Sequence, residues 1–244
     1  MEVYLNRIDG LDDAIISMFE SKRNITKDFE NEIRNEVLRC TSRSFDEGAP
    51  FGALTSTTEK LGEWIKKLLK WGTMHITMLK FIDLSFTVYG LHRGGQDDLD
   101  SHAKRMDNRI IRSSTRLADF ESNEMSDFYN DKIIPTDIAL KFLDIELPET
   151  IKVGAYTYVR ATNGYILQGY ENNKDVKRGL YMLSIPSSFI FRVNLAEFAH
   201  IYKLRGKDGT ANPEVKEAVE LMADQLNKAT CGFITPTILK LIQN

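Results

Sequence analysis

Four arginines recur at helical spacing near the middle of the chain, and we call them the arginine row. The row comprises Arg105, Arg109, Arg112 and Arg116. In a helix these positions would share one face, and their planar guanidinium groups could grip the oxygens of a phosphate. Ser113 and Ser114 favour a binding role, because hydroxyls gain nothing in helix propensity there. The alternative is a solvated helix face, partly neutralised by Asp98 and Asp119.

A second cluster precedes the row. The segment HRGGQDDLDSH (92–102) contains two histidines and three aspartates, and two glycines lie before an expected helix. These residue types suggest a metal site or a phosphate at the helix N-terminus. Acids in the first helical turn argue against an anion, and no metal-ligand spacing is present. We therefore predict an ordinary strand-to-helix turn and no metal.

Composition limits the possible partners. The 244 residues carry 32 basic and 35 acidic side chains, for a formal net charge of −3. The arginine row is therefore a local feature of a mildly acidic chain, which favours a compact anion and argues against nucleic acid. We expect no membrane segment and no signal peptide. Cys40 and Cys231 lack metal or redox spacing, so we predict a cytoplasmic protein.

Periodicity predicts an α+β fold, helix-dominated with a small central sheet. Apolar alternation predicts strands, and Asn163-Gly164 predicts the turn of a hairpin. Thr26, Ser56 (in a capping box with Glu59), Asn194 and Asn212 are the expected N-caps. The expected helices are 25–41, 56–72, 96–120, 136–145, 194–205 and 213–230, and the expected strands are 82–91, 189–193 and a hairpin over 155–170.

The segment from Val176 to Met222 resembles the flavin-dependent thymidylate synthases. That family has an arginine, an aromatic strand ending in Val-Asn, a helix closing in Leu-Arg, and a loop before the next helix. The corresponding elements here are Arg178, FIFRVN, LAEFAHIYKLR ending at Arg205, and ANPEV. Asn212 occupies the place of the usual glutamine.

The arginine row then aligns with the signature of the same family. The final Ser-x-Arg-Tyr of that signature resembles the segment Ser114–Leu117, which has leucine in place of tyrosine. Its Asn-Glu pair falls on Ile111-Arg112, and its Arg-His-Arg on Lys104, Arg105 and Met106. The resemblance implies one domain over 1–244 with the fold of thymidylate synthase-complementing proteins, and the hairpin near 151–172 would be an insertion.

The resemblance also implies a reaction and a set of ligands. The reaction would be reductive methylation of dUMP to dTMP, with FAD as cofactor and NADPH and methylenetetrahydrofolate as co-substrates. Catalysis would rest on positioning and electrostatics. A homotetramer would share active sites between subunits.

By the same resemblance, each site residue has an expected role. Arg205 would be the catalytic residue, stabilising charge on the uracil ring. The substrate-binding residues would be Ser114, Arg116, Arg178 and Arg205. The residues facing the flavin would be Asn194, His200 and Arg105, and Arg109 and Arg112 would replace the phosphate contacts that the altered signature lacks. Two alternatives remain: another C5 modification such as hydroxymethylation, or a non-catalytic nucleotide-binding protein.

Overall fold

The computed structural model describes residues 1–22, 25–44, 49–100, 108–113 and 125–242. These residues form two compact units. The helical unit contains Glu2–Val88, Asp97–Ile111 and Phe189–Asn244, and the hairpin unit contains Met1, Tyr89–Gln96 and Arg112–Ser188. The α+β class expected from the sequence is confirmed, while the expectation of one domain with an inserted hairpin stays a prediction.

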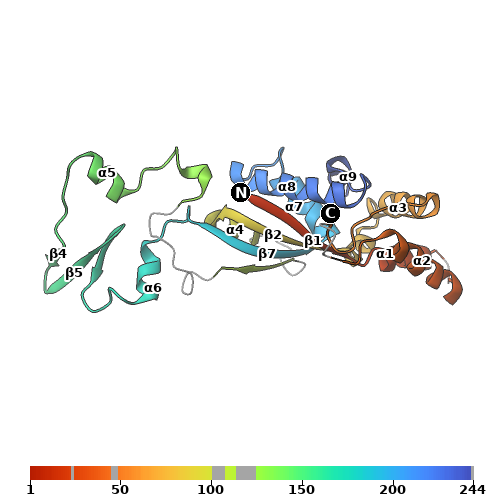
Figure 1. The fold of residues 1–244 in the computed structure, drawn as a ribbon, viewed down its shortest axis with the longest axis horizontal. Helices are drawn as coiled ribbons and strands as arrows, with labels where there is room; N and C mark the ends of the chain where they lie inside the picture. Colours follow the sequence, from red (N-terminus) through yellow and green to blue (C-terminus); the bar gives the residue numbers. More distant parts are fainter. Residues whose placement is uncertain (23–24, 45–48, 101–107, 114–124, 243–244) are drawn as a thin grey trace. The chain divides into compact units, whose positions relative to one another are not determined.

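The helical unit contains most of the helices and most of a four-stranded sheet with the order β1-β2-β7-β3. Figure 1 shows α7, α8 and α9 grouped beside this sheet, and α8 packs on β1. Its elements are β1 (Glu2–Asp9), α1 (Leu11–Glu20), α2 (Lys27–Cys40), α3 (Glu59–Gly72), the 3₁₀ helix η1 (Ile76–Phe81), β2 (Asp83–His92), β3 (Asn108–Arg112), β7 (Pro186–Asn194), α7 (Leu195–Arg205), α8 (Pro213–Ala229) and α9 (Pro236–Leu241).

An apolar core holds the helices on the sheet. Alternate residues of β2 point inward, so Leu84, Phe86 and Val88 are completely buried. Phe86 meets Phe198 of α7 with ring centroids 5.5 Å apart. Aromatic pairs at this distance add to the free energy gained by burial. The sheet and α7 are therefore joined by large apolar side chains.

Polar residues define where the helices begin. Thr26 caps α2 and Asn212 caps α8, as the sequence predicts. The predicted capping box at Ser56 is wrong, because the hydroxyl of Thr58 accepts the Leu61 N–H at 3.2 Å. Glu59 is thus the first residue of α3 and cannot be the third residue of a capping box.

The predicted helix over 96–120 is correct at 96–100 and wrong at 108–112, and its residues 101–107 and 114–120 lie outside the described residues. Helix α4 spans Arg93–Asp100, and Asn108–Arg112 forms strand β3 beside β7. The β-branched pair Ile110-Ile111 suits a strand, and pairing with β7 gives the backbone the hydrogen bonds that a helix would otherwise supply. Sequence spacing alone therefore misassigned this segment.

The hairpin unit contains a separate antiparallel sheet, β4-β5-β6. Ala161 pairs with Gly164, so the two-residue turn is Thr162-Asn163 and not the predicted Asn163-Gly164. Gly164 serves a different purpose, because a Cβ there would lie 3.1 Å from Cδ2 of Leu180. The elements are η3 (Asp127–Tyr129), α5 (Thr136–Phe142), β4 (Thr150–Val153), β5 (Tyr156–Ala161), β6 (Gly164–Leu167), α6 (Lys174–Lys177) and η4 (Arg178–Leu180).

Two further features concern the whole described chain. None of its helices combines the length and apolar character needed to cross a membrane. Cys40 is buried at the end of α2, whereas Cys231 is exposed just after α8, and both thiols are free. The Cys231 thiol donates to the carbonyl oxygen of Leu54 at 3.2 Å.

Candidate functional site

The candidate site is built on the junction between β7 and α7. The side chain of Asn194 is buried, and its Oδ1 accepts the Glu197 N–H at 2.9 Å. This cap satisfies one of the free N–H groups at the helix start and fixes where α7 begins. The predicted N-cap is confirmed, and the expected flavin contact of Asn194 stays a prediction.

Helix α7 ends at Arg205, the residue expected to act in catalysis. Its guanidinium Nη2 lies 2.9 Å from Oδ1 of Asp98, with the two side chains 23% and 30% exposed. A cation at a helix C-terminus is stabilised by the macrodipole, and the carboxylate fixes its orientation. Within the described residues the Nε of Arg205 is buried and has no hydrogen-bond partner. The Nε–H donor of this guanidinium is therefore unmatched.

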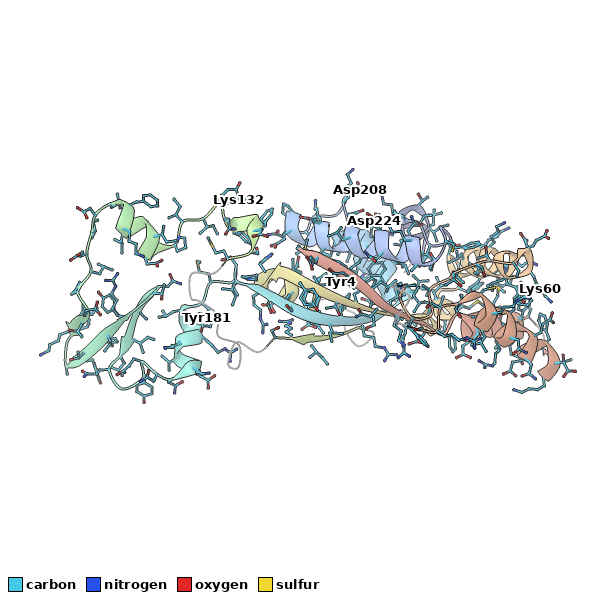
Figure 2. All side chains as sticks on the ribbon, viewed as in Figure 1. Tyr4, Lys60, Lys132, Tyr181, Asp208 and Asp224 are labelled. Carbon is cyan, nitrogen blue, oxygen red and sulfur yellow. The ribbon has the colours of Figure 1, made fainter. Side chains whose placement is uncertain are left out.

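The loop after α7 is held by side chains of α8 and α9. Glu220 accepts the Tyr202 hydroxyl at 3.1 Å and the backbone N–H of Lys207 at 2.6 Å. Burial, together with this carboxylate, raises the pKa of Tyr202 well above its usual range, so the phenol remains a neutral donor. Asp208 points outward (Figure 2) and pairs with Lys240 at 2.6 Å. These contacts fix the chain immediately after Arg205.

The other predicted arginine of the C-terminal segment lies in the hairpin unit. Arg178 begins η4, and its Nη1 is 3.5 Å from Oδ1 of Asp175. Arg205 and Asn194 belong to the helical unit. Arg178 and Arg205 thus belong to different units, and their expected joint contact with substrate stays a prediction. His200 is partly exposed on α7, and its expected flavin contact also stays a prediction.

The arginine row does not form as a helical face. Arg109 and Arg112 belong to strand β3 and not to a helix, so the helical spacing on which the row was predicted does not apply to them. Arg112 is partly buried, and its Nη2 is 3.5 Å from the carbonyl oxygen of Gln96. Arg105, Ser114 and Arg116 lie outside the described residues. Their expected roles therefore stay predictions.

Two residues of α4 have contacts that the sequence did not predict. Asp98 orients Arg205, although no spacing rule connects them because they are far apart in the chain. Gln96 is completely buried, and its amide donates to Leu91 O at 3.0 Å and Ser187 O at 3.2 Å. Its Oε1 has no partner among the described residues.

The start of helix α4 differs from the sequence-based expectation of acids in its first turn. The helix starts at Arg93, so no acid lies in its first turn, contrary to the reason given against an anion there. Its first two N–H groups are already taken, since Arg93 N donates to Ile185 O and Gly94 N to Leu183 O, both at 3.0 Å. Among the described residues, no group of three or more His, Cys, Asp and Glu side chains could hold a metal.

Solved structures of one class of enzyme, the flavin-dependent thymidylate synthases, share this fold over nearly the full length of the chain. The structures are two of ThyX from Helicobacter pylori, each complexed with FAD and dUMP. One is 13% identical with a TM-score of 0.57, covering 98% of this chain and 100% of that one. The other is 14% identical with a TM-score of 0.58, covering 96% of this chain and 100% of that one.

A third solved structure has a different printed activity. It is the UMP/dUMP methylase PolB from Streptomyces cacaoi bound with 5-Br UMP, which is 10% identical with a TM-score of 0.53. The match covers 100% of this chain and 96% of that one. No family model and no curated protein matches the sequence. At these identities the likeness establishes the fold.

Proposed function

We propose that this protein is a flavoenzyme that modifies C5 of dUMP, and specifically that it makes dTMP by reductive methylation. FAD would be the cofactor, with NADPH and methylenetetrahydrofolate as co-substrates. The observation that carries the proposal is the end of α7, where Asp98 holds a guanidinium whose buried Nε has no acceptor. Support for the ligands comes from the FAD and dUMP named for the ThyX structures of the same fold.

The pairing with Asp98 suggests what Arg205 does. Its charge is partly neutralised, so it acts less as a free cation than as a directed donor. A carbonyl oxygen that gains negative charge on the pyrimidine ring is a suitable acceptor for such a group. An unmatched buried N–H costs about 1–3 kcal/mol. An oxygen of the substrate would satisfy it, so binding of the ring would relieve this cost.

Bound FAD would supply the redox chemistry of the reaction. On the protein side, the unmatched Arg205 donor fits an oxygen-rich ligand, and the side-chain Oδ1 of Asn194 accepts the Glu197 N–H, which fixes the position of the amide. Asn194 and His200 would face the cofactor, together with Arg105, Arg109 and Arg112. Ser114, Arg116 and Arg178 would bind the nucleotide. We also propose a homotetramer with shared sites, as the family resemblance implies.

The first test is a visible absorbance spectrum with added FAD, followed by titration with dUMP and a turnover assay. We expect a bound-flavin spectrum that shifts when dUMP is added. Arg205→Ala should lower turnover by about 10²–10³-fold, the usual cost of removing a donor that stabilises developing charge. Asp98→Asn should lower turnover less, because the guanidinium remains but loses its orientation.

A matched control separates this role from the loss of a surface ion pair. Arg192 on β7 pairs with Asp83 at 2.8 Å, in the same unit and at nearly the same distance. Arg192→Ala should leave turnover within about twofold, since exposed pairs contribute little. Full activity in Arg205→Ala, with an unchanged circular dichroism spectrum, would overturn the assignment.

The PolB likeness favours a second candidate, in which the same fold methylates UMP or carries out another C5 modification. Mass spectrometry of products from UMP and dUMP distinguishes these reactions, since methyl and hydroxymethyl products differ by one oxygen. Nucleotide binding with no flavin binding after reconstitution would instead identify a non-catalytic nucleotide-binding protein.

A further inference from the structure

The end of α7 is held by a glutamate to which the proposed function assigns no role. Glu220 on α8 is partly buried, and its two carboxylate oxygens are engaged by different parts of the chain. Its Oε2 accepts the hydroxyl of Tyr202 at 3.1 Å, and its Oε1 accepts the backbone N–H of Lys207 at 2.6 Å. Tyr202 precedes Arg205 by three residues, and Lys207 follows it by two. One carboxylate therefore brackets the arginine.

The chain leaves the helix directly after Arg205, at Gly206. The Gly206 N–H donates to Tyr202 O at 2.8 Å, and its ψ of −172° turns the backbone into an extended conformation. A Cβ on Gly206 would lie 2.5 Å from Tyr202 O and 3.1 Å from Oε1 of Glu220, and the first of these distances is too short for a real side chain. The missing side chain thus lets the carboxylate approach the backbone beside Arg205.

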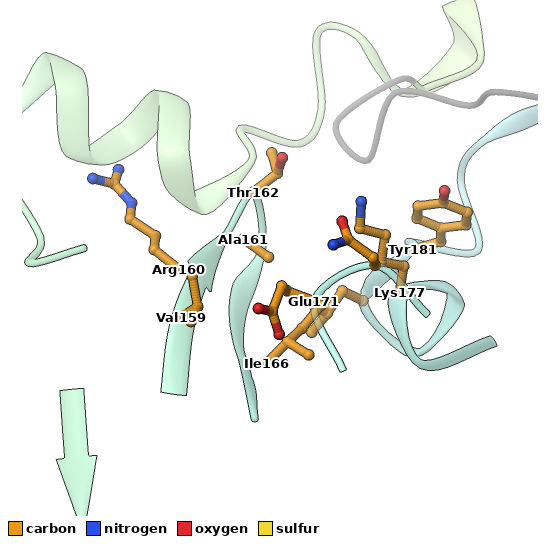
Figure 3. Close-up of a pocket in the computed structure, with 10 residues that line it drawn as sticks. Val159, Arg160, Ala161, Thr162, Ile166, Glu171, Lys177 and Tyr181 are labelled. Atoms are coloured by element: carbon orange, nitrogen blue, oxygen red, sulfur yellow. The ribbon is translucent and has the colours of Figure 1, made fainter. Parts of the chain in front are cut away.

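Glu220 differs from another glutamate that accepts a backbone N–H. Glu171, which lines a pocket of the hairpin unit (Figure 3), accepts the N–H of Gly169, only two residues away. Such a contact orders a turn locally. The partners of Glu220 lie 18 and 13 residues away, on another helix and on the loop that follows it. Loss of Glu220 would therefore loosen the end of α7 against α8, although the packing between the two helices would remain.

We propose that Glu220 is a positioning residue for Arg205, an inference that rests on the proposed function. Asp98 holds the guanidinium at Nη2, and Glu220 holds the chain on both sides of the arginine. The buried Nε–H of the same side chain is the donor that would meet the substrate oxygen. Misplacing such a group by about 1 Å can lower a rate about 10²-fold, because stabilisation of developing charge depends on geometry. Glu220 thus acts on the reaction only through Arg205.

Turnover of two variants tests the consequence of this arrangement. Glu220→Ala should lower kcat by about tenfold and leave KM for dUMP within about threefold, because most of the charge that Arg205 stabilises develops in the transition state. Glu220→Gln should keep kcat within about threefold of the wild-type value. Its amide still offers an oxygen to the Lys207 N–H and an N–H to the Tyr202 oxygen.

Two further variants separate positioning from general stability. Adding Glu220→Ala to Arg205→Ala should change turnover by no more than about twofold, because Glu220 then has no arginine to position. A purely structural role would multiply the two losses. Glu220→Asp keeps the charge but is one methylene shorter and cannot make both contacts. It should lower kcat in the same direction, which tests the proposal even if Glu220→Ala does not fold.

A second measurement reports on Arg205 without any reaction. Its buried Nε–H should give a side-chain signal in a proton–nitrogen correlation NMR spectrum of the full chain, identified by its absence in Arg205→Ala. The signal should shift in Glu220→Ala and stay near its wild-type position in Glu220→Gln. Glu217→Ala is the matched control, because Glu217 lies one turn earlier on α8, is exposed, and has no hydrogen bond or ion pair within the described part of the chain. It should leave the signal in place and kcat within about twofold.

The outcomes distinguish this inference from the proposed function. A shifted signal together with a lowered kcat supports the positioning role. An unchanged signal in Glu220→Ala, a wild-type kcat despite the shift, or losses that multiply in the double variant would each overturn it. A shifted signal in a chain without turnover of dUMP would remove the proposed reaction and leave Glu220 as the residue that holds Arg205.

Discussion

The two units of this chain differ in how far they bury their large apolar side chains. The helical unit encloses large apolar groups such as Phe86, Phe191 and Phe198. In the hairpin unit, α5 buries none of its residues, and Phe142 at its end is 82% exposed. The difference indicates that the first unit is stabilised by its core, whereas the second depends more on its backbone ladder.

The sharpest test of this comparison exchanges a phenylalanine for alanine in each unit. Phe198→Ala removes a completely buried ring that contacts Phe86, and should cost about 3–5 kcal/mol of unfolding free energy. Phe142→Ala should change the unfolding free energy by no more than about 0.5 kcal/mol. Urea unfolding followed by circular dichroism measures both. Equal losses would contradict the contrast between the units.

Helix caps provide a second, smaller test. Asn194 caps the buried helix α7, whereas Asn173 caps the short exposed helix α6. Asn194→Ala should cost about 1–2 kcal/mol, since a cap is lost in a buried setting. Asn173→Ala should have little effect on the global transition, because α6 can open locally. Denaturant midpoints would show the difference, and a larger loss for Asn173→Ala would count against it.

The smallest expected change in stability comes from exposed ion pairs and depends on pH. The hydrogen bond from Lys240 lowers the pKa of Asp208, and the hydrogen bond from Lys132 lowers the pKa of Asp131. A lowered folded pKa stabilises the protein above the ordinary value near 4, and the gain disappears as the pH falls through the lowered value.

Asp208→Asn should therefore lower the melting temperature at pH 6 by at most about 2 °C, with no difference at strongly acidic pH. Asp131→Asn should do less, because the Lys132 pair is between neighbours and also forms in the unfolded chain. Thermal melts at the two pH values test this order. A penalty for Asp208→Asn that grows on acidification would show the sign to be wrong.

The sequence predicted those elements whose local signals agreed with tertiary packing. Thr26, Asn194 and Asn212 were correct as caps because each is a residue type that accepts the free N–H groups of a helix start and lies directly before a helix. Helix α7, which ends at Arg205, was also placed correctly, and the family resemblance is strongest there.

The errors share a physical cause. Helical spacing of arginines could not reveal that Asn108–Arg112 pairs with β7, because such pairing joins residues far apart in the chain. The Asp98–Arg205 pair depends on the same long-range packing. Strands β1 and β4 and helices α1 and α9 were not predicted; β4 and α9 are short, with four and six residues, whereas the patterns of β1 and α1 were passed over.

The unequal exposure of the two cysteines provides an internal reporter. A maleimide dye should attach to Cys231 in the native protein, because that residue is exposed, whereas Cys40 is only 1% exposed. Modification of Cys40 then requires transient opening of the structure around the end of α2. The ratio of the two labelling rates would measure the free energy of that opening without any denaturant.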